Sequence, residues 1–475
     1  MPKFIDEDED FENLLSTSNK VLRINLNENI YGTFAEIGAG QETVRNFFRS
    51  GQASGTVAKT ISAYDKEFSD AIYGLEPQRR YVTEARLKAI LDHETKLIEE
   101  RISRQKHPNK LFFSYANTVA TIDFAKKYKG HGWLGIRFQS EPEEEYSEIL
   151  IHVQFHEANA ALQQISLGIM GVNLIYGAFY QYDQPTELLA SLYDEISTDK
   201  IEIDTINFTG PLFKKVDNRL MSLKLVKNEM TQAVMFGPDG HMVLPASILY
   251  KKNILTLRGS FRPVTKVNMS MYQKSLELFL KEKKVAKENT VVLFEMTLSN
   301  LKTEGKIDEK DFLERADLLC SLGQTVMISN FQEYYKVVEY FSVHTKERLG
   351  LTMGVNTFID IFDEKYYRHL SGGILEAFGK LFFRNLKVYL YPLKDPETGK
   401  ITTSENLKVH PRMKELYKFF KENGRVVDIT DYDPDLLDIY SREVYAMISE
   451  GKSGWEEMLP EKTAAMIKEN NMFQK

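Results

Sequence analysis

The feature of this sequence that most constrains its fold is a regular alternation of two kinds of segment between residues 201 and 390. Short apolar runs are separated by amphipathic stretches of about 10–15 residues, a spacing typical of strands joined by helices. Such alternation indicates repeated βαβ units and therefore a largely parallel sheet. We expect strands at residues 201–208, 233–236, 254–257, 290–296, 325–328, 349–353 and 386–390, with helices between them.

The sequence thus predicts an α/β protein, and its sheet is either barrel-like or doubly wound because periodicity does not separate the two. No segment signals a strand reversal. Residues 1–110 are expected to form an N-terminal elaboration with Gly-rich loops and a long charged helix, and residues 111–394 the main α/β body. A polar turn, KDPETG, then leads into a helical C-terminal cap at residues 395–475.

Charge and composition exclude several partners. The net charge of −7 gives no basic footprint for nucleic acid. The one run of like charge, at residues 6–10, is acidic and is typical of a solvated tail. We therefore expect no nucleic-acid partner.

Membrane and export signals are also not expected. The start, MPKFIDEDEDF, is acidic where a signal peptide is basic and then apolar. The most apolar window, residues 165–180, contains Asn173 and is shorter than the roughly 20 residues of a spanning helix, so it indicates a core element. With Cys320 as its single cysteine, the chain cannot form an intramolecular disulfide, and we expect a cytoplasmic protein without a membrane partner.

Two loops near the N-terminus carry the densest anion-binding pattern. Gly38, Gly40 and Gln41 form a turn between an expected strand and an expected helix. Glycine lets backbone N–H groups turn toward an anion, and a helix N-terminus favours negative charge. A second Gly/Ser-rich loop is flanked by the cations Arg49 and Lys59. We expect these five residues to bind a phosphate or carboxylate.

The glycine turn has two other interpretations. A dinucleotide fingerprint is disfavoured because Thr43 stands in place of the third glycine and Asp65 is badly placed as the acidic partner. A tight turn that packs on the helix, without a ligand, stays open.

Arginines follow a later strand, in the segment LRGSFRPVTK. The planar forks of Arg258 and Arg262 suit bidentate phosphate or carboxylate binding, with surface salt bridging as the alternative. Loops that leave parallel strands emerge on one face of a sheet, so we expect this loop and the N-terminal loops to line one pocket.

Three residues are candidates for acid or base chemistry. Asp217 opens a helix, where a capping role is the alternative. Glu295 lies in an apolar strand, where a carboxylate needs either a function or a structural ion pair. His131 precedes a strand that places Arg137 on one face, which indicates a polar pocket wall or, alternatively, an exposed strand face.

No metal site is expected. His152 and His156 fall in a strand-like segment, and residues four apart in a strand are separated by about 13 Å. Zn–N bonds of about 2 Å cannot span that distance. No motif names a cofactor.

Seven segments together resemble a broad bacterial protein family, and the resemblance spans nearly the whole chain. They are YGTFAEIGAGQ, SGTVAKTISAYD, HGWLGIRFQ, GVNLIYGAF, VDNRLMSL, LYKKNILTLRGSFRPVT and SGGILEAFGKLF. Members of this family carry the labels nicotinate-nucleotide adenylyltransferase and TonB-dependent receptor. A receptor needs a signal peptide and alternating lipid-facing strands, so the sequence excludes that label.

The other label implies nucleotidyl transfer through a Gly-rich turn followed by a His-X-Gly-His pair. Here no such pair follows Gly40, and the next histidine is His93, so no catalytic residue is carried over. We expect an enzyme that acts on a phosphorylated or nucleotide-like small molecule, with the transferases as its first candidate class. Adenylyltransferase-type chemistry and a non-enzymatic interaction or assembly protein stay open as alternatives. The sequence indicates neither the cofactor nor the oligomeric state.

Overall fold

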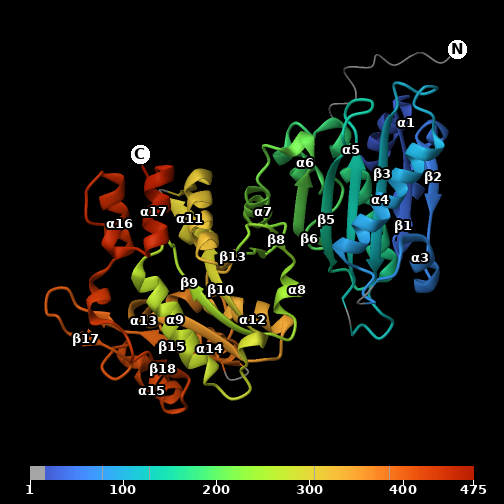
Figure 1. Ribbon diagram of the computed structural model, residues 1–475. Helices are drawn as coiled ribbons and strands as arrows, with labels where there is room; N and C mark the ends of the chain where they lie inside the picture. Colours follow the sequence, from blue (N-terminus) through green and yellow to red (C-terminus); the bar gives the residue numbers. More distant parts are fainter. Residues whose placement is uncertain (1–15, 77–78, 128, 304, 384–385, 475) are drawn as a thin grey trace. The chain divides into compact units, whose positions relative to one another are not determined.

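The computed structural model describes residues 16–474 except 77–78, 128, 304 and 384–385. The chain divides into two compact units, unit 1 (Met1–Thr231) and unit 2 (Gln232–Lys475), each built on its own main sheet (Figure 1). The acidic run at residues 6–10 lies outside the described residues.

The described part of unit 1 holds a six-stranded mixed sheet in the order β2-β1-β3-β4-β5-β6. β1 pairs in parallel with both β2 and β3, whereas β3, β4, β5 and β6 pair in antiparallel fashion. The carboxyl ends of β1, β2 and β3 therefore share one edge with the start of β4. The strands are β1 (Ile30–Gly38), β2 (Val57–Ile61), β3 (Leu111–Ala120), β4 (His131–Phe138), β5 (Ser147–Phe155) and β6 (Ile201–Thr209).

Helices cover both faces of this sheet. α4 (Glu84–Arg101) begins at the cap Thr83, buries Leu87 and Ile90 completely, and contacts β1, β3 and β4. Thr95 of α4 donates to Ser114, whereas the ring of Phe179 in α5 lies against Phe113. Successive strand residues point to opposite faces, so α4 and α5 lie on opposite faces of the sheet. The other helices of unit 1 are α1 (Thr17–Leu26), α2 (Glu42–Ser50), α3 (Lys66–Tyr73), α5 (Ala160–Tyr180), α6 (Pro185–Ser191) and α7 (Asn218–Lys227).

α5 is long and apolar enough to cross a membrane by length and composition, and most of its apolar window is buried inside the protein. It packs against α1, α2, β4 and β6. Asn173, in the middle of α5, is fully buried and donates to the backbone oxygens of Leu192 and Asp194. This is the environment of a core helix, as the sequence predicts for residues 165–180.

The described part of unit 2 holds an eight-stranded sheet in the order β18-β15-β14-β9-β10-β13-β7-β8. All pairings from β18 to β13 are parallel, and only β7 and β8 run antiparallel to their neighbours. The chain passes outward from β9 through β10 to β13, then returns to the other side of β9 at β14. The strands are β7 (Ala233–Phe236), β8 (Met242–Val243), β9 (Asn253–Arg258), β10 (Thr290–Thr297), β13 (Thr325–Ser329), β14 (Leu349–Gly354), β15 (Lys387–Tyr391) and β18 (Val426–Asp428).

This strand order is that of a doubly wound sheet. The predicted α/β class is confirmed, and the open order in unit 2 selects the doubly wound alternative over the barrel. Two short hairpins, β11 (Lys302–Thr303) with β12 (Lys306–Ile307) and β16 (Leu393–Lys394) with β17 (Ile401–Thr402), lie outside the main sheet. The connecting helices are α8 (Pro245–Leu249), α9 (Lys266–Leu280), α10 (Leu298–Leu301), α11 (Glu309–Ser321), α12 (Tyr334–His344), α13 (Val355–Ile361) and α14 (Gly373–Leu381).

Helices close the C-terminal part of unit 2, as the sequence predicts. They are α15 (Lys414–Glu422), α16 (Ser441–Ser449) and α17 (Glu461–Asn470). Val444 and Ile467, from α16 and α17, form a buried cluster with Leu318 of α11 and with Trp455. α16 and α17 therefore share a core with the parallel body.

The structure differs from the sequence-based expectations in one respect. The expectation that no strand reverses is wrong for unit 1, where β3 to β6 form an antiparallel meander. The compact units divide at residues 231 and 232, and the boundaries expected after residues 110 and 394 stay predictions. β1, within residues 1–110, pairs along its whole length with β3.

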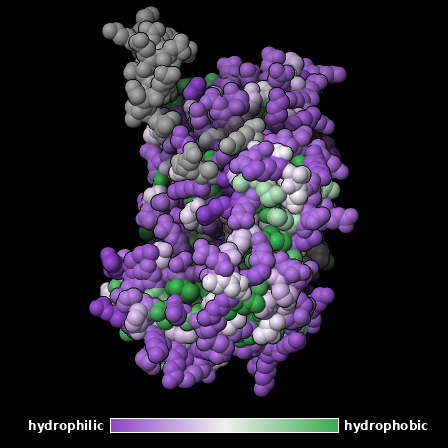
Figure 2. Space-filling model, turned by 90° about the vertical axis from the view of Figure 1, so that its left-hand side faces the viewer, coloured by the Kyte–Doolittle hydropathy of each residue, from purple (hydrophilic) through white to green (hydrophobic). Residues whose placement is uncertain are grey.

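The surface drawn in Figure 2 is mostly hydrophilic, with hydrophobic residues in small groups. This is the ordinary distribution for a protein face in water.

Candidate ligand-binding site

A pocket of about 440 Å³ opens at the edge of the unit 1 sheet where β1, β2 and β3 end. In α/β proteins, ligands bind outside the carboxyl ends of parallel strands, and this volume is in the range of small-molecule sites. The pocket is lined by residues 37–39, 63–66, 69, 81–82 and 118–124.

One cation and three aromatic rings give the pocket its chemical character. Lys66, at the start of α3, has no ion-pair partner among the described residues, and its Nζ lies 5.4 Å from the centre of the Tyr81 ring. Tyr64 and Phe124 are exposed at the rim. The hydroxyl group of Ser69 and the carboxyl groups of other lining residues add hydrogen-bonding capacity. This combination suits a ligand with a flat ring and a negative charge.

The glycine turn borders this pocket, and two of its backbone N–H groups already donate hydrogen bonds within the protein. Gly38 has φ of +76°, and its N–H donates to Ala63 O at 3.2 Å. The N–H of Ala39 donates to Val119 O at 3.2 Å. Gly38 lines the pocket, so its predicted ligand contact stays a prediction.

Gly40 packs against Asn117, whose Nδ2 donates to Gly40 O at 2.9 Å. A Cβ at this position would overlap the Asn117 amide, which explains the glycine. Gln41 donates through Nε2 to Gly38 O and, at 3.0 Å, to Ser62 Oγ. Gly40 and Gln41 do not line the pocket, and their ligand roles also stay predictions.

The start of α2 already holds an anion, the carboxylate of Glu36. Its oxygens accept from the backbone N–H groups of Thr43 at 2.9 Å and Val44 at 3.3 Å, and from Asn117 Nδ2 at 3.4 Å. Unpaired N–H groups and the helix dipole favour a negative charge at this position. Burial raises the pKa of Glu36 to about 7, although these hydrogen bonds act in the opposite direction.

The raised pKa of Glu36 predicts a pH-dependent stability. This pKa rises from the ordinary 4.5 to about 7 on folding, so the folded chain binds the proton more tightly than the unfolded chain. The associated stability is present below the ordinary pKa and is lost as pH rises through about 7, at about 1.4 kcal/mol for each pH unit between the two pKa values. Glu36→Gln cannot titrate, so its urea midpoint should fall less than the parent's between about pH 5 and about pH 8. Equal falls for the two proteins would contradict the assignment.

The predicted cations of unit 1 lie at three different places. Lys59 pairs with buried Glu94 of α4 at 2.8 Å. Arg137 pairs with Glu148 and Asp92. Arg49 is exposed at the end of α2. None of the three lines the pocket, and their anion contacts stay predictions.

His131, the predicted catalytic histidine, is the first residue of β4 and lies beside the pocket edge. It pairs across the ladder with Ala120, one of the lining residues. Its Nδ1 lies 3.0 Å from Nε2 of His152, and Nδ1 of His152 lies 2.6 Å from Asp204 Oδ1. No sequence pattern indicates this chain of groups, because its members come from three separate strands that meet only in the sheet.

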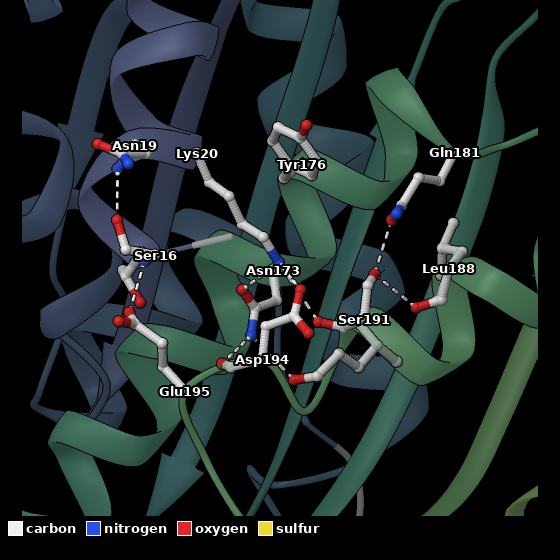
Figure 3. Close-up of polar contacts among 12 residues, drawn as sticks. Ser16, Asn19, Lys20, Asn173, Tyr176, Gln181, Leu188, Ser191, Asp194 and Glu195 are labelled. Atoms are coloured by element: carbon white, nitrogen blue, oxygen red, sulfur yellow. Dashed lines mark hydrogen bonds and ion pairs between the residues drawn. The ribbon is translucent and has the colours of Figure 1, made fainter. Parts of the chain in front are cut away.

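A second buried polar cluster ties α1 to the rest of unit 1 (Figure 3). Lys20, 2% exposed, donates to Asp194 at 2.6 Å, to Asn173 at 2.9 Å and to Ser191 O at 3.4 Å. The centre of the Tyr176 ring lies 5.2 Å from its ammonium. Burial lowers the pKa of Lys20, while Asp194 acts to raise it. All three ammonium donors have partners, so we interpret the cluster as structural.

In unit 2, Arg258 and Glu295 form a buried pair at the carboxyl edge of β9 and β10. Two guanidinium nitrogens of Arg258 donate to the two oxygens of Glu295 at 2.9 Å each, and Ser329 Oγ donates to Oε1 at 2.6 Å. The guanidinium also lies 4.2 Å from the centre of the Tyr334 ring. This is the ion-pair alternative that the sequence left open for Glu295.

Arg262 and Asp217 have partners as well. Arg262 pairs with Asp311 at 2.6 Å and donates to Tyr445 OH at 2.8 Å. Asp217 caps α7 by accepting from the N–H of Arg219 at 2.8 Å, which agrees with the capping alternative. Arg258 and Arg262 belong to unit 2, whereas Gly40 and Lys59 belong to unit 1, so their expected convergence stays a prediction.

Within the described part of the chain, no group of three or more His, Cys, Asp or Glu side chains is arranged to hold a metal ion.

The residues that give the pocket its character do not stand out in the sequence. Lys66 and Tyr64 follow β2, a strand that escapes prediction because only its ends are strongly apolar. The sequence signal that could have found them is a cation close to an aromatic residue, after a segment rich in β-branched residues. Phe124 lies in the loop after β3, where a single exposed aromatic residue forms no pattern.

Comparisons with known proteins identify no family. No protein-family model and no curated protein matches the chain. The chain is similar to a competence/damage-inducible protein CihA from Agrobacterium tumefaciens, with 10% identity and a TM-score of 0.25, over 37% of this chain and 97% of the other. It is similar to a competence or damage-inducible protein from Enterobacter asburiae at 12% identity and a TM-score of 0.26, over 34% of this chain and 96% of the other.

A third structure, a competence-damaged protein (CinA) superfamily protein from Enterobacter cloacae, gives 11% identity and a TM-score of 0.24 over 38% of this chain and 96% of the other. The likeness thus covers little more than a third of the chain, and it carries no argument about the reaction.

Proposed function

We propose that unit 1 binds a phosphorylated, nucleotide-like small molecule in the pocket at the ends of β1, β2 and β3, and that the protein is a cytoplasmic enzyme acting on it. The observation that supports this most is Lys66, a cation without an ion-pair partner among the described residues, placed in a pocket with two exposed aromatic rings. The ammonium suits a phosphate, and the ring faces of Tyr64 and Phe124 suit a base.

The position of the pocket supports the same conclusion. Loops that follow β1, β2 and β3 each contribute to the lining, which is how α/β enzymes assemble ligand sites. Two of the cations predicted for unit 1, Lys59 and Arg137, are held by carboxylates of their own, and neither these two nor Arg49 lines the pocket. Lys66 is therefore the cation of this site.

Binding of AMP to the whole protein, measured by calorimetry, tests the proposal. Lys66→Ala should weaken AMP binding about 10- to 150-fold, because a charge-assisted contact contributes about 1.5–3 kcal/mol. Phe124→Ala should weaken it by a similar factor through lost stacking. Adenosine, which lacks the phosphate, should bind the parent and Lys66→Ala equally.

Lys88→Ala is the matched control, since Lys88 is exposed on α4 and, among the described residues, forms its ion pair with Glu84 of the same helix. Its affinity for AMP should equal that of the parent. If AMP fails to bind, or binds Lys66→Ala and Phe124→Ala as tightly as the parent, the pocket is not the ligand site.

A further inference from the structure

Three side chains on neighbouring strands form a continuous hydrogen-bonded chain beside the pocket. His131 comes from β4, His152 from β5 and Asp204 from β6, with separations of 3.0 Å and 2.6 Å. His152 and Asp204 each have only 2% of their side chains exposed, whereas His131 is half-buried. The chain therefore has a buried carboxylate at one end and an accessible imidazole at the other.

The separations within the chain allow one assignment of its protons, with the Asp204 carboxylate as the acceptor. An ionised carboxylate only accepts, so Nδ1 of His152 carries the proton that it donates to Asp204. Nε2 of His152 then accepts from Nδ1–H of His131. Gln154 donates to the second oxygen of Asp204 at 2.7 Å and fixes the carboxylate.

The outer nitrogen of the chain, Nε2 of His131, is left as an unprotonated acceptor with no hydrogen-bond partner among the described residues. Burial, together with the neighbouring His152, lowers the pKa of His131 to about 4, while Asp204 acts to raise it. His131 is therefore neutral at neutral pH.

His131 also lies next to the ligand pocket. It is the register partner of Ala120, and two residues along on the same face Thr118 pairs with Trp133. Ala120 and Thr118 both line the pocket. Directly paired residues in antiparallel strands have Cα atoms about 4.5–5.5 Å apart, so the backbone of His131 lies beside that of a lining residue, although His131 itself does not line the pocket.

We propose that Asp204, His152 and His131 form a proton relay, in which His131 Nε2 is the general base for a hydroxyl group or water at the pocket ligand. This inference rests on the proposed function of the pocket. His131 would be the catalytic residue, and His152 and Asp204 are positioning residues.

The proton step balances within the chain itself. The O–H bond of the hydroxyl or water breaks, the oxygen keeps the electron pair, and a new N–H bond forms at His131 Nε2. The proton on His131 Nδ1 moves to Nε2 of His152. The positive charge thus comes to lie on His152, whose other nitrogen is 2.6 Å from the Asp204 carboxylate. The reverse transfer returns the proton to a leaving group.

Site-resolved labelling with diethyl pyrocarbonate tests the relay, because this reagent acylates unprotonated imidazole nitrogens. In the full-length protein at neutral pH, His131 should be labelled, and saturating AMP should slow that labelling at least about ten-fold. His241, which is 82% exposed in unit 2, is the internal control and should react at the same rate with and without AMP.

The variant Asp204→Asn tests whether His131 is labelled because of the relay or only because it is exposed. The asparagine no longer demands a proton on His152 Nδ1, so ¹⁵N NMR should show His131 losing its single Nδ1–H tautomer, and labelling should slow several-fold. Unchanged tautomer and labelling in Asp204→Asn would overturn the relay. AMP binding seen by thermal shift without protection of His131 would overturn the inference and leave the proposed function standing, whereas no AMP binding at all would overturn both.

Discussion

Lys20→Met is expected to destabilise unit 1 by about 1–3 kcal/mol, because it leaves the acceptors of a buried ammonium without their donor. Lys20 is 2% exposed and is the donor to both Asp194 and the fully buried Asn173. Methionine fills much of the same volume, so the loss comes from stranded acceptors rather than from a cavity.

Urea unfolding followed by Trp133 fluorescence measures this loss. The chain has two tryptophans, Trp133 in unit 1 and Trp455 in unit 2, so a Trp455→Phe background reports on unit 1 alone. Lys88→Met, at a lysine whose side chain is 47% exposed, is the control and should cost no more than about 1 kcal/mol. Similar midpoints for Lys20→Met and Lys88→Met would show that the buried pair does not stabilise the unit.

Glu295→Gln is expected to destabilise unit 2 by about 3–5 kcal/mol, because both partners of this ion pair are buried. The substitution leaves the guanidinium of Arg258 without its counter-charge in a buried position. It also replaces one acceptor oxygen of Glu295 by an amide that faces the donors Arg258 or Ser329. The cation–π contact with Tyr334 does not offset the loss, since such contacts contribute about 2 kcal/mol when desolvated.

Trp455 fluorescence in a Trp133→Phe background is the measurement, with exposed Glu288→Gln as the control. A double variant, Arg258→Met with Glu295→Leu, gives the sharper comparison, because removing both charges together is often close to neutral. It should be more stable than Glu295→Gln alone. A double variant that is less stable than Glu295→Gln would mean that packing, and not charge pairing, stabilises this part of unit 2.

The fold of unit 2 is accessible from the sequence because its strands are buried on both faces. Runs such as residues 290–296 and 349–353 are almost wholly apolar, and amphipathic helices separate them, so length and period suffice. Unit 1 is harder. Its strands β3, β4 and β5 follow one another without intervening helices, and nothing in their apolar pattern says that successive strands run in opposite directions.

Individual side chains are predicted less well than elements, and the reason is that a sequence shows residue types but not partners. Arg258 and Glu295 each stand out as functional candidates, yet they bind each other. His131 and His152 occur in unrelated sequence contexts, and only the pairing of β4 with β5 places them in contact. Lys66, by contrast, enters the proposed site because it has no ion-pair partner among the described residues, and a missing partner leaves no trace in a sequence.

The carboxylate of Glu36 accepts from the amides at the start of α2, the helix that follows the glycine turn and was expected to favour a bound anion. A phosphate from solution that approached the amides of Thr43 and Val44 would have to displace the Glu36 carboxylate. This carboxylate belongs to the neighbouring strand, so it is held at the amides at a high effective concentration. The helix end is therefore occupied by a group of its own chain. Because burial raises the pKa of Glu36 to about 7, that group competes with a free anion most strongly above this pH and least in acid.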